Sequence, residues 1–326
     1  MRDSPMLPEH LRIVSLIPSA TEIVAALGLS DQLVGRSHEC DYPPNIRDRP
    51  ICTRPRFDTD GSSPEIHTRV TDLLESALSI YSIKTDVLKD LQPTHIITQA
   101  QCEVCAVSLS DVEDAVAQLT DTHPQIISLE PKVLSDMLSD IYRVAEVLGV
   151  DGEDLGIELK LRVDTCAQKT QSINEADRPT IACIEWTDPL MAAGNWIPEL
   201  VKLAGGRSLF GEIGQQSAWI DWDSLCAANP DVIIFLPCGY DLNKTREEVQ
   251  PLIHRPEWSA LKAAQTERAY IADGNQYFNR PGPRLIDSLE IFAEILHPEL
   301  FNFGYQEKGW KPLQEASRVT NRSSAQ

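Results

Sequence analysis

Two stretches of the sequence, DVLKDLQPTHII at Asp86–Ile97 and DSLCAANPDVII at Asp223–Ile234, share one pattern. Each carries Asp-x-Leu-x-x-x-x-Pro followed by an apolar run, and the two copies lie 137 residues apart. In each copy a short amphipathic helix should end before the proline, which cannot continue it, and the β-branched run is typical of a buried parallel strand. The chain therefore holds the same local unit twice.

A second similarity links the beginnings of the two halves. RIVSLIPSATEIVAALG at 12–28 and TIACIEWTDPLMAAGNWIPELVKLAGG at 180–206 both predict a strand, a loop, a helix and a glycine at the helix end. In the first copy, Ser19 and Glu22 are expected to form a capping box, and Gly28 is expected to supply the left-handed residue that ends the helix.

The alternation of strands and helices predicts the α/β class, with two Rossmann-like lobes built on central parallel sheets. The strands are expected at Ile13–Leu16, Gln32–Gly35, His95–Thr98, Gln125–Leu129, Thr180–Ile184, Asp231–Leu236 and Ala269–Ala272. We expect an N-terminal lobe at 1–130, a connecting helix at 131–175, a C-terminal lobe at 176–305 and a disordered tail at 306–326. The connecting segment keeps a helical period, with a break expected near Gly149 and Gly152.

Composition excludes several classes of partner. The chain of 326 residues has 29 Lys and Arg against 49 Asp and Glu, and its formal charge of −20 repels phosphate backbones and anionic lipid. No run of 18 apolar residues occurs, so we expect no membrane insertion. Nucleic acid is not an expected partner, and we expect a monomer.

Cysteine usage and the N-terminus bear on the compartment. Eight scattered cysteines in a chain of this size suggest reduced thiols. The N-terminal residues have Pro8, Glu9 and His10 where a signal peptide would have its apolar core. As written, the chain is expected in the cytoplasm; a missing leader would place it in the periplasm.

Aromatic residues gather in the loops that follow the predicted strands. Ligands of open parallel sheets bind outside the carboxyl ends of the strands, because these loops and the following helix N-termini converge there. Rings on such loops favour a planar, apolar ligand held in a cleft between the lobes, although packing under a loop is an equal alternative for any single ring. The rings are Tyr42, Trp186, Trp196, Tyr240, Tyr277 and Phe278.

The Cys-x-x-Cys pair Cys102 and Cys105 lies on one of the same loops. With His38 or Cys40 it would make a zinc or iron site. Thioredoxin-type exchange is less favoured, because CEVC has neither Gly nor Pro between its cysteines and no cation nearby to lower a pKa. We favour the cleft wall as the role of this pair and keep the metal site as the alternative.

The motifs of common enzyme classes are absent. The sequence has no G-x-S-x-G, no Walker loop and no His-Glu-x-x-His, and its histidines are spread singly. We therefore expect a protein that is not an enzyme.

The residues also resemble a known family. RIVSLIPSATEIVAALGLSDQLVGRSHECDYP, LQPTHIITQ, GNWIPELVKLAGG and AYIADGNQYFNRPGPRLIDSLEIFAEILHPELF together resemble the substrate-binding proteins of cobalamin and iron-chelate importers, closest to the cobalamin-binding branch. The resemblance covers roughly Leu11 to Phe301. It implies two Rossmann-like lobes joined by one long helix, a ligand cleft between them, and binding without catalysis.

The resemblance also implies roles for residues. Tyr42 is similar to the aromatic residue that stacks on the corrin face, and Glu65 and Glu199 are similar to the acidic pair that docks on an ABC importer permease. Three features depart from the family pattern: the missing export signal, the long stretch Cys52–Ile83, and QCEVCAVS, which resembles the mark of a non-exported subgroup. The expected ligand-binding set is Ser19, His38, Tyr42, Gln101, Trp186, Asn195, Trp196, Tyr240, Tyr277, Phe278 and Arg280.

The first hypothesis is thus a binding protein for cobalamin, another corrinoid or a related metal chelate, for transport or for handling inside the cell, with no cofactor of its own. The second is a metalloprotein that holds zinc or iron through Cys102, Cys105 and either His38 or Cys40. A third, weaker hypothesis is an intracellular scaffold that keeps the cleft without permease contacts.

Overall fold

The computed structural model describes residues 11–75, 80–99, 109–117 and 123–314. The chain forms two compact units. Unit 1 contains the residues up to Arg162 and the short segment Arg280–Ile286, and unit 2 contains Val163–Asn279 and the residues from Asp287 onward. The cleft expected between the two lobes stays a prediction.

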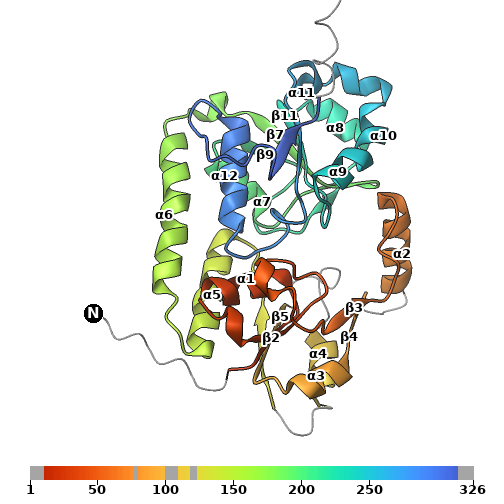
Figure 1. The fold of residues 1–326 in the computed structure, drawn as a ribbon. Coiled ribbons are helices and arrows are strands. Elements are labelled where there is room, and N and C mark those ends of the chain that lie inside the picture. The colour runs from red at the N-terminus through yellow and green to blue at the C-terminus, as the bar shows by residue number, and fades with distance from the viewer. Residues whose placement is uncertain (1–10, 76–79, 100–108, 118–122, 315–326) are drawn as a thin grey trace, which may run out of the picture. The chain divides into compact units, whose positions relative to one another are not determined.

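Unit 1 is built on a parallel sheet with the strand order β2-β1-β5-β6. Helix α1 packs on β1, β2 and α5 (Figure 1). A separate antiparallel pair joins β3 to β4. The strands are β1 (Ile13–Ser15), β2 (Leu33–Arg36), β3 (Thr53–Pro55), β4 (Tyr81–Ile83), β5 (His95–Gln99) and β6 (Gln125–Leu129). The helices are α1 (Pro18–Ala26), α2 (Ser63–Glu75), α3 (Thr85–Leu91), α4 (Leu109–Ala117), α5 (Leu134–Leu148) and α6 (Glu153–Thr170), whose last residues enter unit 2.

Unit 2 is built on a mixed sheet. Its path is β10-β8-β7-β11-β12-β13, with β9 paired to the first residues of β7 and β8 to the last. Strands β9, β7, β11 and β12 are parallel. The strands are β7 (Thr180–Thr187), β8 (Leu190–Ala192), β9 (Arg207–Leu209), β10 (Ala218–Trp219), β11 (Val232–Phe235), β12 (Ala269–Ala272) and β13 (Trp310–Pro312). The helices are α7 (Ile197–Leu203), α8 (Trp222–Ala228), α9 (Leu242–Glu248), α10 (Gln250–Ile253), α11 (Lys262–Gln265) and α12 (Leu285–Leu296).

Short 3₁₀ turns complete the secondary structure, at η1 (Ser30–Gln32), η2 (Pro44–Ile46), η3 (Glu175–Asp177) and η4 (Pro256–Ala260). In the described part of the chain, no helix is both long enough and apolar enough to cross a membrane.

The repeated sequence unit folds the same way twice. Helices α3 and α8 end at Gln92 and Asn229, which adopt the left-handed conformation with φ of 45° and 43°. A proline follows each residue, and strands β5 and β11 begin two residues after the prolines. Each strand is paired on both sides by parallel neighbours, as its continuous apolar run predicts. The predicted α/β fold with parallel strands in both halves is confirmed.

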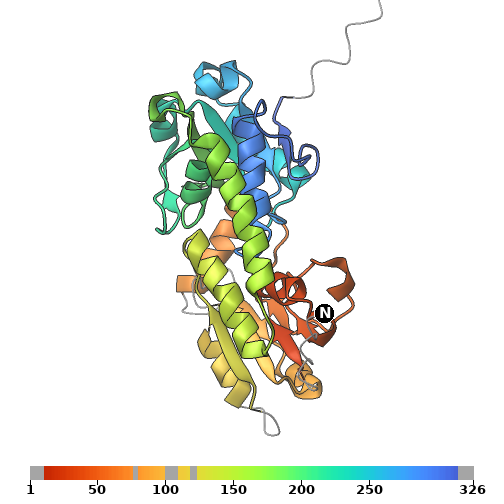
Figure 2. The same cartoon turned by 90° about the vertical axis from the view of Figure 1, so that its left-hand side faces the viewer.

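The expected connecting helix is two helices. Helix α5 ends at Gly149, which has a φ of 70° and the left-handed conformation that glycine adopts without strain, and α6 begins four residues later (Figure 2). Gly152 lies against the Ala145 side chain, where an added Cβ would come within 2.9 Å. The break was predicted at these glycines, but a single connecting helix over 131–175 was wrong.

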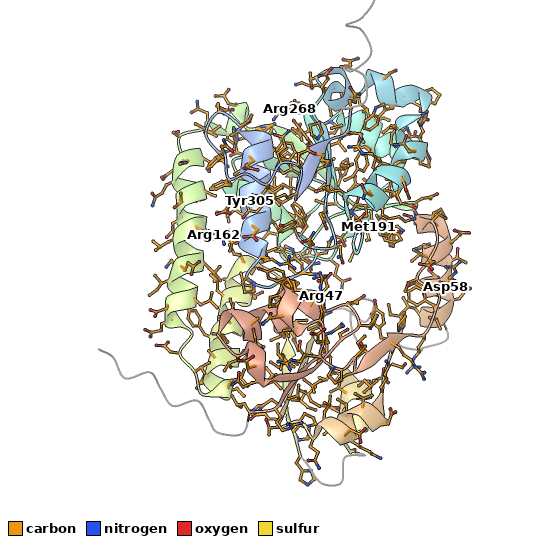
Figure 3. The ribbon with its side chains drawn as sticks, viewed as in Figure 1. Arg47, Asp58, Arg162, Met191, Arg268 and Tyr305 are labelled. Atoms are coloured by element: carbon orange, nitrogen blue, oxygen red, sulfur yellow. The ribbon has the colours of Figure 1, made fainter. Side chains whose placement is uncertain are left out.

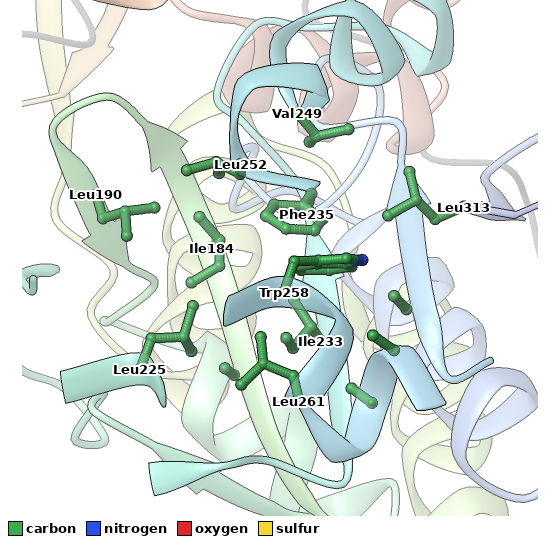
Figure 4. Close-up of a cluster of buried hydrophobic side chains, with 14 of the residues drawn as sticks. Ile184, Leu190, Leu225, Ile233, Phe235, Val249, Leu252, Trp258, Leu261 and Leu313 are labelled. Atoms are coloured by element: carbon green, nitrogen blue, oxygen red, sulfur yellow. The ribbon is translucent and has the colours of Figure 1, made fainter. Parts of the chain in front are cut away.

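The core of unit 2 extends into the C-terminal residues. Phe235 and Trp258 lie with ring centroids 6.2 Å apart at its centre, and Leu313 packs against the same cluster (Figure 4). Strand β13 pairs with β12, and Glu294 accepts hydrogen bonds from the backbone of residues 303–305 and from Trp310 Nε1 at 3.0 Å. The expectation of disorder from residue 306 is therefore wrong as far as Gln314, because this segment adds a strand and buries Leu313.

Candidate functional site

The loop that follows β2, residues 37–47, carries three of the predicted site residues and is tied down by two arginines. Arg36 donates to the carbonyls of Ser37 and Cys40 at 3.0 Å and to that of Arg47 at 2.8 Å. Arg47, labelled in Figure 3, donates to the Asp41 carbonyl at 2.8 Å. These four bonds satisfy carbonyls that a loop would otherwise leave to water, so the loop is held in one shape.

His38 lies at the tip of a turn in this loop, because the Cys40 N–H donates to the Ser37 carbonyl. Its Nδ1 is 2.7 Å from Thr53 Oγ1, and its backbone N–H donates to the same oxygen at 3.1 Å. Burial, with the nearby positive charges of Lys84 and Arg36, lowers the pKa of His38 to about 4. The ring is therefore neutral near pH 7.

Tyr42 presents an exposed ring that is supported from one side. The side chain is 42% exposed, and the Arg284 guanidinium lies 3.9 Å from the ring centroid. Arg284 donates two hydrogen bonds to the Glu22 carboxylate, at 3.0 and 2.7 Å, and both side chains are buried. The cation covers one face of the ring, so the exposed area belongs to its remaining surface.

Arg280, which was expected among the ligand-binding residues, is instead buried in an ion pair. It is 7% exposed and donates to the Asp41 carboxylate at 2.5 and 3.3 Å. Its second amino group also reaches the Glu39 carbonyl at 3.4 Å. This correction has an electrostatic cause: a buried guanidinium needs an anion, and the loop of residues 37–47 supplies one.

Ser19 and Glu22 do not form the expected capping box. Helix α1 begins with Ile17 as its N-cap, whose apolar side chain cannot accept a cap bond, so that Pro18 is its first residue and Ser19 lies inside the helix. Glu22 is drawn to Arg284 instead. Ser19 is 1% exposed, and within the described part of the chain its Oγ has no hydrogen-bond partner. Ser19 is thus enclosed by protein and shows no open surface for a ligand.

In unit 2, the rings of Trp186 and Tyr240 lie close to each other near the ends of two adjacent strands. Trp186 is the second-last residue of β7, Tyr240 follows β11, and their ring centroids are 5.4 Å apart. Tyr240 is 8% exposed and has the Lys244 ammonium 5.6 Å from its ring. Trp186 is partly buried, and no described residue accepts a hydrogen bond from its Nε1, which is itself buried.

Trp196 and Phe278 are core residues rather than rim residues. Trp196 is 7% exposed and its Nε1 donates to the Phe278 carbonyl at 2.6 Å. Phe278 is fully buried, its centroid is 5.0 Å from that of Phe292, and its N–H donates to Ser288 Oγ at 2.9 Å. Both were predicted to contact ligand, and for Phe278 the structure leaves no surface for that contact.

Tyr277 and Asn195 lie partly buried in the same unit. The Tyr277 ring meets Phe278 and Tyr305 edge to face, with centroids 6.5 and 6.0 Å apart. Asn195 has a φ of 50°, and its backbone exchanges hydrogen bonds with the carbonyl of Gln215 and the N–H of Gly214. Their role in binding stays a prediction.

The cysteine site of the second hypothesis finds no support in the described residues. Cys40 is buried, accepts a hydrogen bond from Thr21 Oγ1 at 3.0 Å, and has its pKa raised to about 12 by burial. Among the described residues, no group of three His, Cys, Asp or Glu is placed to hold a metal ion. Gln101, Cys102 and Cys105 lie outside the described residues.

The two acidic residues expected to dock on a permease differ in exposure. Glu65 is exposed in the first turn of α2, and its carboxylate accepts from the N–H and the hydroxyl of Ser62, both at 2.8 Å. Glu199 is partly buried in the first turn of α7. Glu65 therefore helps to begin its own helix, whatever else it binds.

Sequence reasoning missed the anchors of the site. It singled out Tyr42 and His38 but neither Arg284, which supports one ring, nor Thr53, which orients the other. The pattern Arg-Pro-Gly-Pro-Arg at 280–284 was a signal, because two arginines beside a stiff turn need acidic partners. Nothing in the local sequence says that those partners are Asp41 and Glu22, which lie 239 and 262 residues away.

Comparison with known proteins gives a consistent result. The family described as Periplasmic binding protein matches residues 13–275. An uncharacterized ABC transporter substrate-binding lipoprotein of Bacillus subtilis is 22% identical over 311 residues, covering 92% of this chain and 84% of the relative. The vitamin B12-binding protein of Vibrio cholerae is 23% identical over 289 residues, covering 87% of this chain and 88% of the relative.

Solved structures share the fold. The periplasmic vitamin B12-binding protein of Vibrio cholerae superposes with a TM-score of 0.61 at 20% identity, over 87% of this chain and 96% of its own. A periplasmic heme-binding protein of Pseudomonas aeruginosa superposes with a TM-score of 0.67 at 18% identity, over 89% and 93%. Both similarities concern the fold.

Proposed function

This chain belongs to the periplasmic binding protein family, and from that premise we propose that it is a solute-binding protein for a corrinoid or a related tetrapyrrole metal chelate. It binds without catalysing a reaction. Its relatives include a vitamin B12-binding protein and its structural neighbours a heme-binding protein. The two ligands in those names are both flat macrocycles that enclose a metal.

The observation that carries the proposal is the exposed ring of Tyr42. It stands beyond the carboxyl end of β2, where ligands of open parallel sheets bind. A tyrosine that is 42% exposed on a loop held by Arg36 and Arg47 offers a flat, apolar surface without first having to be ordered. Stacking on such a ring is the contact that a planar macrocycle can make and a small polar solute cannot.

Trp186 gives the proposal a second point of support, in unit 2. Its indole N–H is buried and has no acceptor among the described residues. A buried donor without an acceptor is costly, so a ligand oxygen that accepted from it would add to binding. We propose that an amide or carboxylate oxygen at the edge of the macrocycle accepts from Trp186 Nε1.

An absorbance titration tests this function. Cyanocobalamin, dicyanocobinamide and hemin are added separately to the purified chain, and we expect at least one to bind at one molecule per chain with a shifted or intensified absorbance band. Trp186→Phe keeps an aromatic ring, though a smaller one, and removes the indole N–H donor, so it should weaken binding of the same chelate by about three- to tenfold. Flat titrations with all three chelates would reject the proposal.

Transport is the use that we propose for this binding. The relative named as an ABC transporter substrate-binding lipoprotein supplies the reason, and Glu65 and Glu199 are the residues that we assign to contact with a permease. In a host that needs an external corrinoid, Glu65→Ala with Glu199→Ala should reduce growth while the purified variant keeps its affinity. Equal growth of the variant and the parent strain would argue against a permease contact through these two residues.

A further inference from the structure

His38 is fixed in the loop of residues 37–47 by contacts to its ring and to its backbone. Thr53 Oγ1 meets both its Nδ1 and its backbone N–H, and Ser37 Oγ lies 3.0 Å from the same threonine oxygen. The Tyr81 ring meets the imidazole at 61°, with centroids 4.9 Å apart. Tyr81 is held in turn by Glu39, whose carboxylate accepts from its hydroxyl at 2.6 Å.

The second ring nitrogen of His38, Nε2, takes no part in this network. Within the described part of the chain, no residue makes a hydrogen bond to Nε2. Because the two nitrogens point to different sides of the imidazole, the bond from Nδ1 to Thr53 directs Nε2 away from β3. Metal-bound histidines in proteins are oriented in this way, by a hydrogen bond from the nitrogen that does not bind the metal.

The threonine suits this arrangement because its hydroxyl can both accept and donate. When Nδ1 carries the proton, the Thr53 oxygen accepts from Nδ1 and from the His38 backbone, and its own proton goes to Ser37 Oγ. Both lone pairs of the threonine oxygen are then used. Nε2 keeps a lone pair for a metal, and no hydrogen bond of the network is lost.

Among the described residues, the surroundings of His38 suit a metal that is already held by a chelate. A bare zinc or iron ion needs several protein ligands, and the described residues provide no group of three around His38. A metal that already sits in a macrocycle needs only one ligand along its axis, and a neutral imidazole suits iron and cobalt. We propose that His38 Nε2 is an axial ligand to the metal of a bound chelate, an inference that rests on the proposed function.

This assignment narrows the ligand class. The chelate must have a free or exchangeable axial position, as diaquocobinamide and hemin do, and dicyanocobinamide does not. Because of His38, the chain would bind chelates with an exchangeable axial position more tightly than chelates whose axial positions are blocked. Thr53 acts through His38 and is a positioning residue.

Electron paramagnetic resonance tests the inference directly. Cob(II)inamide, made by reducing diaquocobinamide, is bound to the wild-type chain, and one axial nitrogen should split each cobalt hyperfine line into a triplet. In protein grown with ¹⁵N-labelled histidine the triplet should become a doublet. Binding without this splitting would overturn the inference and leave the proposed function standing, whereas no binding of any corrinoid or of hemin would overturn both.

A matched pair of variants identifies the residue. His95 also has its Nδ1 near a threonine hydroxyl, Thr94 Oγ1 at 2.9 Å, but it begins β5 and so lies at the opposite end of the same sheet. His38→Gln should abolish the splitting and weaken the affinity for diaquocobinamide by about tenfold or more. Its affinity for dicyanocobinamide should stay within about twofold of the wild-type value. His95→Gln should change none of these. Splitting that survives in His38→Gln would assign the nitrogen to another residue and overturn the inference.

Discussion

Two segments that follow parallel strands carry aromatic rings, and the structure uses these rings in opposite ways. The loop of residues 37–47, after β2, turns Tyr42 outward against a cation and leaves 42% of it exposed. The segment of residues 273–279, after β12, turns Phe278 inward and buries it completely. Both stand at the same kind of place in an α/β unit. Position at the end of a strand therefore selects candidate residues, and the partners that surround each ring decide its role.

The first prediction tests the buried side of this comparison. Phe278→Ala should lower the free energy of unfolding by about 3–5 kcal/mol, because it leaves a cavity beside Phe292. The control is Phe303→Ala, a ring that is 38% exposed and should cost about 1 kcal/mol or less. Urea unfolding gives both values. If the two variants were equally stable, Phe278 would not be a core residue and its part in ligand binding would return as an open question.

The second prediction concerns the support behind Tyr42. Glu22→Leu should destabilise the chain by about 3 kcal/mol, because it leaves the buried Arg284 charge without its partner, and Arg284→Leu should cost somewhat less, because Arg280 Nη1 stays 3.8 Å from the Glu22 carboxylate. The double variant should lose less than the sum of the two. Urea unfolding of all four proteins completes the cycle, and strictly additive losses would show that the two side chains do not act as a pair.

Much of the fold could be predicted from the sequence, because its signals are local. The Asp-x-Leu-x-x-x-x-Pro units fix a helix end and a strand start within twelve residues, and seven strands lie at or close to their predicted positions. Strands β3, β4, β8, β9, β10 and β13 were missed. They are two or three residues long, too short to show a period of two.

The site was harder to predict, because its partners are distant in sequence. Arg280 was predicted to contact the ligand. Its ion-pair partner Asp41 lies 239 residues earlier in the chain, so the sequence around Arg280 does not indicate it. Phe278 was assigned to ligand because local sequence could not show that its backbone is held by Ser288 and Trp196. Tyr42 was selected because it lies on a loop after a predicted strand and is similar to the aromatic residue that stacks on the corrin face, and its exposed ring agrees with that choice.

The third prediction tests the exposed side of the comparison. Tyr42→Ala should lower the free energy of unfolding by about 1–2 kcal/mol, less than Phe278→Ala, since 42% of the Tyr42 surface is already exposed and the variant also loses one cation–π contact. The measurement is the same urea series as for Phe278→Ala. A loss of about 3 kcal/mol or more would mean that Tyr42 is structural, and the contrast between the two segments would disappear.

The fourth and smallest effect is a pH trend in the segment of residues 273–279. Asp273 is 3% exposed, and burial raises its pKa although the N–H groups of Gln276 and Asn275 oppose the rise. The folded chain therefore holds this proton at pH values where the unfolded chain has lost it, and stability from Asp273 falls as pH rises above about 4. Asp273→Asn removes the titration, so the stability of the variant relative to wild type should improve as the pH rises above about 4. A trend of the opposite sign would mean that the hydrogen bonds outweigh burial.

The most direct test of the account measures affinity at Tyr42 itself. Calorimetry compares the wild type with Tyr42→Ala and with Tyr142→Ala, a control ring on α5 that is 44% exposed, using whichever chelate binds in the absorbance titration. The account predicts at least about a tenfold loss of affinity for Tyr42→Ala, as removal of a ring that stacks on the ligand should give, and an unchanged value for Tyr142→Ala. Equal affinity of wild type and Tyr42→Ala, with both proteins folded, would contradict it.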